Sequence, residues 1–232
     1  MYNILTLNKI SAAGLGKFDA EKYFCTDDCA SPDAVIVRSA SMHDTEIPSS
    51  VLSIARAGAG YNNIPVDKCT GKGICVFNTP GANANAVKEL VLCALFLSSR
   101  KIIAGSKWCE TLKGSGDEVS KKVEKGKSSF AGPEIKGKTL GVIGLGAIGV
   151  LVANGAKALG MDVIGYDPFL SDKAASTLDK TIRVTSVIDR VFEESDYITL
   201  HEPLNDSTRN TICAETLAKC KDGVRILNFA RG

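Results

Sequence analysis

The stretch KTLGVIGLGAIG, residues 138–149, decides the fold of this chain. It places Gly144, Gly146 and Gly149 in the spacing G-x-G-x-x-G, between one apolar run that predicts a strand and another that predicts a helix. Alone, the pattern also suits a glycine-rich turn that binds nothing. Here DVIGYD, residues 162–167, follows and predicts a second strand that ends in Asp167. Strand, glycine turn, helix and strand together predict a dinucleotide-binding α/β unit.

The residues of this unit favour NAD over NADP as the cofactor. Gly144 permits the tight turn, Gly146 lets the backbone approach a pyrophosphate, and Gly149 lets the helix pack closely on the strand. The free N–H groups at the start of the helix face the phosphates. Asp167 follows Gly144 by 23 residues, where a carboxylate accepts hydrogen bonds from a ribose hydroxyl and repels a 2′-phosphate. No arginine follows it in DPFL to bind that phosphate.

The composition predicts a globular cytoplasmic protein that binds a small molecule. Hydrophobic residues make up 44% of the 232 residues and charged residues 23%, an ordinary globular balance. The 28 basic and 26 acidic residues nearly cancel, so no nucleic-acid partner is expected. Eight cysteines without a C-x-x-C pair, and only two histidines, indicate free thiols and no metal site. Residues 139–156 carry no charge, but their glycines favour strand, turn and helix over a membrane span, and the N-terminus has no secretory signal.

Apolar runs along the rest of the chain predict two parallel sheets. Short runs predict strands at NIL near the N-terminus and at 34–39, 53–58 and 74–78, with a helix at 66–72. After Pro80-Gly81, Asn83 or Asn85 can cap a long helix that is apolar on most sides and connects two domains. The second domain has predicted strands at 139–143, 162–166, 196–200 and 224–228, and helices at about 147–159, 172–178, 186–194 and 214–219. We expect an α/β fold of two doubly wound parallel-sheet domains, with residues 113–127 as a solvated loop or short exposed helix.

Two further features at strand ends suit an organic acid. The turn at residues 57–60, AGAG, follows a predicted strand, and successive backbone N–H groups in such a turn suit a carboxylate. A plain strand-to-loop turn explains these residues equally well. Arg231 follows the last predicted strand, and its guanidinium there offers a fork of donors to an acid. A surface arginine that closes a strand is the equal alternative.

Nearly the whole chain resembles the D-isomer-specific 2-hydroxyacid dehydrogenase family. The matching stretches occur in the family's order and are VIVRSAS (35–41), RAGAGYNNI (56–64), GICVFNTPGANANAVKELVL (73–92), KTLGVIGLGAIG (138–149), YITLHEPLNDSTRNTI (197–212) and ILNFARG (226–232). The members that act on 3-phosphoglycerate are the most similar. The resemblance implies a flavodoxin-like substrate domain at residues 1–98 and a Rossmann NAD domain at residues 99–232, with NAD in the cleft.

The resemblance also implies the roles of individual residues. By the match, Arg231 is the catalytic arginine, which binds the carboxylate and the keto oxygen of the substrate. The implied substrate contacts are Arg38, Ser39, Ala59, Gly60 and Asn83. The cofactor would be held by Val87, Gly144, Gly146, Ala147, Ile148, Gly149, Asp167, Pro168, His201, Pro203, Phe229 and Ala230.

The activity that the resemblance implies is hydride transfer between NAD and C2 of a small 2-hydroxy acid. 3-Phosphoglycerate, at the first step of serine synthesis, is the expected substrate. Glyoxylate, hydroxypyruvate and D-lactate are alternatives within the family, and an NAD-binding regulatory module without turnover is the alternative outside it. A homodimer or larger homo-oligomer is expected.

The family's acid–base histidine and its supporting glutamate lie beyond the N-x-A-R-G motif, which here occupies residues 228–232. Only His43 and His201 are available within the sequence. Nothing pairs His43 with a carboxylate, and the resemblance gives His201 a cofactor-lining role. We therefore expect residues 1–232 to be the front part of a longer enzyme, with an incomplete Rossmann domain, and to show no turnover alone.

Overall fold

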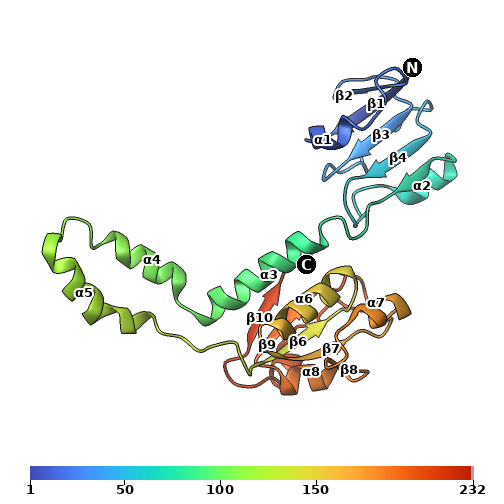
Figure 1. Ribbon diagram of the computed structural model, residues 1–232. Coiled ribbons are helices and arrows are strands. Elements are labelled where there is room, and N and C mark those ends of the chain that lie inside the picture. The colour runs from blue at the N-terminus through green and yellow to red at the C-terminus, as the bar shows by residue number, and fades with distance from the viewer. Residues whose placement is uncertain (231–232) are drawn as a thin grey trace. The chain divides into compact units, whose positions relative to one another are not determined.

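The computed structural model describes residues 1–230 and divides the chain into two compact units, Met1–Asn83 and a second unit that begins at Ala84. Each unit is built on a five-stranded parallel sheet; helices lie in two of the four connections of the first sheet and in all four connections of the second (Figure 1). Parallel strands require such crossover connections, because each strand must return to the same edge before the next begins. The predicted α/β class with two parallel sheets is confirmed.

The first sheet has the strand order β2-β1-β3-β4-β5. Val35, Val37 and Ile54 point to one face of this sheet and form the centre of its core. The first strand lies between the second and the third, which is the flavodoxin-like arrangement. The elements of this unit are β1 (Tyr2–Leu7), α1 (Ala12–Leu15), β2 (Tyr23–Thr26), β3 (Ala34–Val37), β4 (Ser53–Arg56), α2 (Val66–Gly71) and β5 (Cys75–Phe77).

The second sheet has the strand order β10-β9-β6-β7-β8. The strand order reverses between β6 and β9, and ligands of open α/β sheets bind at the carboxyl ends of the strands beside such a point. The elements of this sheet layer are β6 (Thr139–Ile143), α6 (Ala147–Ala158), β7 (Asp162–Tyr166), α7 (Asp172–Thr177), β8 (Arg183–Thr185), α8 (Ile188–Glu194), β9 (Tyr197–Leu200), α9 (Ala214–Leu217) and β10 (Arg225–Asn228).

Two separate apolar cores bury both faces of the second sheet. One core joins α6 to the sheet and includes Val142 and Val152, both fully buried. The other joins α8 to the opposite face and includes Phe192 and Ile198. Strands buried on both faces carry continuous apolar runs, which is why TLGVI and YITL are apolar at nearly every position.

Helix α3 (Ala84–Ser99) packs with the second unit rather than ending the first. Its Val91 and Leu95 belong to the same core as α6. At its end the Ser99 hydroxyl lies 2.6 Å from the Tyr197 hydroxyl, and Arg225 Nε donates to the Ser98 carbonyl at 3.0 Å. These contacts place the division between the units after Asn83, whereas the sequence predicted it after residue 98.

Two edge strands, β2 and β8, are absent from the sequence prediction. Each lies at the edge of its sheet, is four or three residues long, and is partly exposed, so no buried apolar run marks it. The predicted strand at 53–58 is also shorter in the structure. It ends at Arg56, because Gly58 turns the chain with a φ of +154°.

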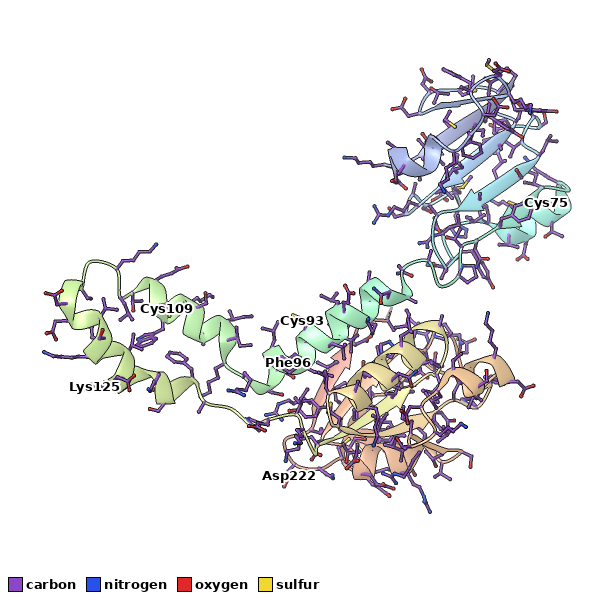
Figure 2. All side chains as sticks on the ribbon, viewed as in Figure 1. Cys75, Cys93, Phe96, Cys109, Lys125 and Asp222 are labelled. Atoms are coloured by element: carbon purple, nitrogen blue, oxygen red, sulfur yellow. The ribbon has the colours of Figure 1, made fainter. Side chains whose placement is uncertain are left out.

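Residues 101–130 form a segment that we call the arm: α4 (Ile102–Glu110), η1 (Gly116–Glu118), α5 (Val119–Gly126) and η2 (Lys127–Phe130). None of these elements contains a buried residue. The Trp108 and Phe130 rings pack at 5.1 Å between centroids, and Figure 2 shows Cys109 and Lys125 on the two helices. The predicted short exposed helix therefore exists within a longer exposed segment. Within residues 1–230, no helix is long and apolar enough to cross a membrane.

Candidate functional site

The glycine turn joins β6 to α6, and two of its glycines are required by close contacts. Gly144 has a φ of +90°, and a Cβ atom there would lie 2.8 Å from the carbonyl group of His201. A Cβ atom at Gly149 would overlap the carbonyl oxygen of Gly144. A larger residue is therefore excluded at both positions by these close contacts, and at Gly144 also by the positive φ angle.

Gly146 differs from these two because its surroundings are empty. A Cβ atom there would meet no atom within 4 Å. Gly146 is the N-cap of α6, and no side chain caps this helix. The first N–H groups of α6, including that of the exposed Ala147, are thus open to an anion. This geometry suits a pyrophosphate that approaches the backbone closely.

The Asp167 carboxylate follows β7 and holds the glycine turn. Its Oδ2 accepts the Leu145 N–H at 2.8 Å, and its Oδ1 accepts the Phe169 N–H at 2.8 Å. A carboxylate has about four acceptor positions, so both oxygens can still accept from ribose hydroxyls. Pro168 and Phe169 beside it are exposed. Asp167 can therefore both fix the turn and contact a ribose.

His201 lies beside the glycine turn, just past β9. Its backbone N–H donates to the Ile143 carbonyl at 2.8 Å, and its ring Nε2 lies 3.0 Å from the hydroxyl of the fully buried Thr199. Burial lowers the pKa of His201 to about 4, so the ring is neutral at neutral pH. The structure therefore brings His201, Asp167 and the glycine turn together at the carboxyl ends of three neighbouring strands.

A pocket of about 400 Å³ lies at the carboxyl ends of β9 and β10. Pro203 and Ala230, both predicted cofactor contacts, line it. Its polar lining comprises Glu202, which lies within the segment 201–203 predicted to hold the cofactor, and four residues that the sequence did not predict: Thr208, Asn210, Thr211 and Asn228. The Thr211 hydroxyl donates to Glu202 at 2.5 Å. Most of these residues fall within the quoted stretch 197–212, so the spacing of its polar residues was the available signal.

Three other predicted cofactor residues pack inward. Val87, Ile148 and Phe229 are partly buried against the apolar core that α6 shares with the sheet. Each can contribute an apolar surface at the edge of the site, but none offers a hydrogen-bonding side chain. Among residues 1–230, no cluster of three metal-ligating side chains occurs.

In the first unit, Arg38 and Ser39 follow β3 and are exposed. Asn8, which follows β1 with a φ of +72°, fixes this loop. Its Oδ1 accepts the N–H groups of Ser39 at 2.8 Å and Ala40 at 2.6 Å. The Ser39 backbone N–H is thereby engaged, so the side chains of Arg38 and Ser39 are the groups that the loop offers to a ligand.

The turn at residues 57–60 follows β4, and the end of β5 holds it. The Gly58 carbonyl accepts the Thr79 N–H at 3.0 Å, and the Ala59 carbonyl accepts Asn78 Nδ2–H at 2.7 Å. Within residues 1–230, neither the Ala59 N–H nor the Gly60 N–H has a hydrogen-bond acceptor. Both N–H groups are therefore open to a ligand or to solvent, and the two alternatives left open by the sequence both remain compatible with this turn.

Two predicted residues remain to be placed. Asn83 is exposed and is the last residue of the first unit. Arg231, the predicted catalytic arginine, lies outside the described residues. The structure thus gathers the predicted cofactor residues within the second unit and Arg38, Ser39, Ala59 and Gly60 on loops of the first.

The glycine turn, its carboxylate and the strand order define a Rossmann-type dinucleotide-binding unit. The family model of the D-isomer specific 2-hydroxyacid dehydrogenase NAD-binding domain matches residues 94–232, and the chain belongs to this family. NAD is accordingly its cofactor.

Known relatives are similar over most of this chain. A hydroxypyruvate reductase of Thermotoga maritima is 42% identical over 203 residues, which cover 86% of this chain and 61% of that protein. A D-3-phosphoglycerate dehydrogenase of Synechocystis is 39% identical over 206 residues, 86% of this chain and 34% of that protein. The structure of a glyoxylate reductase from Paecilomyes thermophila superposes with a TM-score of 0.77 at 26% identity, covering 100% of this chain and 74% of that one. The chain thus spans between about one third and three fifths of the length of these two sequence relatives.

Proposed function

We propose that the protein is an NAD-dependent oxidoreductase that transfers a hydride between the nicotinamide and C2 of a small 2-hydroxy acid. The observation that carries this proposal is the glycine turn: Gly146 opens to empty space at the start of α6, while Asp167 holds the same turn from the next strand. Membership of the 2-hydroxyacid dehydrogenase family supports the reaction class.

In this proposal the cofactor lies along the carboxyl edge of the second sheet. The N–H groups of Ala147 and Ile148 at the start of α6 bind the pyrophosphate, and Asp167 accepts from the ribose. His201, Pro203, Phe229 and Ala230 line the remaining part of the cofactor site, and Pro168 and Val87 border it.

The substrate in this proposal binds through the loops of the first unit. The Ala59 and Gly60 N–H groups bind the carboxylate, and Arg38 binds a phosphate at the other end of the molecule. Ser39 and Asn83 supply further polar contacts. Arg231 binds the carboxylate and the keto oxygen.

We propose 3-phosphoglycerate as the substrate, which places the enzyme in serine synthesis. The similarity to a D-3-phosphoglycerate dehydrogenase and the exposed Arg38 support this choice. Hydroxypyruvate is the second candidate, because a hydroxypyruvate reductase shares 42% identity. Steady-state rates of the native gene product with NAD and 3-phosphoglycerate, and with NADH and hydroxypyruvate, glyoxylate or pyruvate, test the proposal. Higher kcat/KM for an unphosphorylated acid would refute the substrate, and no turnover of any would favour a regulatory NAD-binding module.

Neither histidine is suited to donate the proton that the reduced substrate needs. The His201 ring is neutral at neutral pH, since its pKa is lowered to about 4. His43 Nε2 lies 2.8 Å from the Asn62 carbonyl, and within residues 1–230 neither ring contacts a carboxylate. We therefore propose that residues 1–232 alone bind NAD without turnover. Activity of this chain that His201→Ala abolishes would overturn the proposal.

We further propose that the arm and α3 join two copies of the chain in a homodimer. Ile102 and Ile103 are 52% and 58% exposed at the start of α4, and Phe96 is exposed on α3 (Figure 2). Exposed apolar side chains on a segment without its own core favour association. The eight free cysteines support a reducing, cytoplasmic location.

A further inference from the structure

We infer that Asn78 is a positioning residue for the carboxylate of the substrate, an inference that rests on the proposed function. Asn78 lies just past β5 and offers its side-chain amide to the Ala59 carbonyl at 2.7 Å. This hydrogen bond joins the end of β5 to the turn at 57–60 through a side chain. Nothing in the sequence pattern predicts this contact, since the two residues are 19 positions apart.

Because the peptide bond is planar, a contact that fixes the Ala59 carbonyl also fixes the direction of the Gly60 N–H. In a planar trans peptide, the N–H of one residue points opposite to the C=O of the residue before it. The Gly58 carbonyl is held by the Thr79 N–H and the Ala59 carbonyl by Asn78. The N–H groups of Ala59 and Gly60 therefore both point away from the end of β5.

Two neighbouring N–H groups that point the same way, without an acceptor in the described chain, form a site for a carboxylate. Thr79 fixes the first of them through its backbone, so the side chain at that position does not matter for this bond. Asn78 fixes the second through its side chain. Loss of the Asn78 donor frees the 59–60 peptide to rotate, and the Gly60 N–H then spends less time in the binding orientation.

The test compares two substitutions that both remove the side-chain donor of Asn78, one with a neutral residue and one with a negatively charged residue. Asn78→Ala removes the amide, and Asn78→Asp keeps the shape but replaces the donor with an acceptor. Cys75→Ser is the control, because Cys75 is exposed at the start of β5 (Figure 2) and pairs with Ser53 at the start of β4, at the opposite end from the turn. Thermal unfolding and NADH affinity show that each variant is folded.

The readout is the ¹H–¹⁵N spectrum of the chain, titrated with glycolate and separately with 3-phosphoglycerate. In the unmodified protein we expect both acids to shift the Ala59 and Gly60 amide signals downfield. Both Asn78 variants should weaken this binding by about three- to tenfold, with NADH affinity unchanged, as expected for one hydrogen bond. Cys75→Ser should bind as the unmodified protein does.

Each other outcome has a defined meaning. If neither acid shifts these two amides, or if the Asn78 variants bind as tightly as the unmodified protein, the inference is wrong. A weakened Asp variant beside an unchanged Ala variant would show charge repulsion alone and would also overturn it. If glycolate shifts the amides and 3-phosphoglycerate does not, the proposed substrate fails, while the variants still test Asn78 with glycolate.

Discussion

Replacing Asp167 with asparagine tests the cofactor site most directly. One carboxylate oxygen accepts the Leu145 N–H and the other accepts the Phe169 N–H, both at 2.8 Å. Asparagine keeps one oxygen and places an NH₂ group where the other was, so one of the two backbone donors faces another donor. A hydrogen bond to a charged group contributes about 1.5–3 kcal/mol, and the lower value applies because Asp167 is only half-buried. A looser glycine turn should therefore weaken NADH binding by about tenfold.

The same substitution should also reduce the preference for NADH over NADPH. In the unmodified protein we expect NADH to bind at least about tenfold more tightly, because the Asp167 carboxylate repels a 2′-phosphate. Asparagine carries no charge, so the affinity for NADPH should fall less than the affinity for NADH. Titration of the fluorescence of each reduced cofactor with the protein measures both constants.

Asp162→Asn is the matched control. Asp162 begins the same strand that Asp167 follows, and it pairs with Lys157 at 3.8 Å at the opposite end of that strand. The Asp162→Asn substitution removes one negative charge from the second unit, as Asp167→Asn does, but leaves the contacts of the glycine turn intact. An Asp167→Asn variant with unchanged NADH affinity and an unchanged cofactor ratio would refute the assignment. Equal effects from both substitutions would show that net charge, and not the contact with Leu145, is responsible.

Three more predictions follow from individual contacts. The unfolding free energy, measured with denaturant, should fall by up to about 3 kcal/mol between pH 6.5 and pH 4, because His201 takes up a proton near pH 6.5 in the unfolded chain but only near its pKa of about 4 in the folded protein. His201→Gln should abolish this contribution to the pH dependence of stability. Asp196→Asn should cost about 1–2 kcal/mol in thermal unfolding, since Asp196 accepts the Thr139 N–H at 2.8 Å and pairs with Lys221 at 3.5 Å; an unchanged melting temperature would contradict this. Ile103→Glu should weaken the proposed dimer by at least about tenfold in sedimentation experiments without lowering monomer stability, and an unaltered dimer would exclude Ile103 from the interface.

The glycine turn shows which parts of this molecule are predictable from its sequence. Spacing along the chain fixes β6, the turn and α6, because a strand, a tight turn and a helix are local structures. The close contacts of Gly144 with His201 and of Gly149 with Gly144 also agree with the tight turn and the close helix packing that the motif predicts. The motif predicted a ribose contact for Asp167 but not its hydrogen bond from Leu145 in the turn, which joins the ends of the neighbouring strands β6 and β7.

The asparagine contacts of the first unit show why the rest was not predictable. Asn8 reaches the loop after β3 across 31 positions, and Asn78 reaches the turn after β4 across 19. These pairs depend on which strands are neighbours in the sheet and not on any local pattern. The short edge strands β2 and β8 were missed for a related reason: an edge strand is stabilised by one neighbour and needs no apolar run of its own.

In both units an aspartate at the amino end of one strand accepts a backbone N–H of the neighbouring strand, although the sequence contains no internal repeat. Asp33 directly precedes β3 and accepts the Asn3 N–H of β1 at 2.7 Å. Asp196 directly precedes β9 and accepts the Thr139 N–H of β6 at 2.8 Å. In each sheet the carboxylate thus fastens the first strand of the unit to a neighbouring parallel strand at the edge opposite the ligand loops. These hydrogen bonds help to fix the register of the paired strands at their amino ends. The loops at the carboxyl ends are thus free to carry glycine turns and asparagine contacts that serve ligand binding and contribute little to stability.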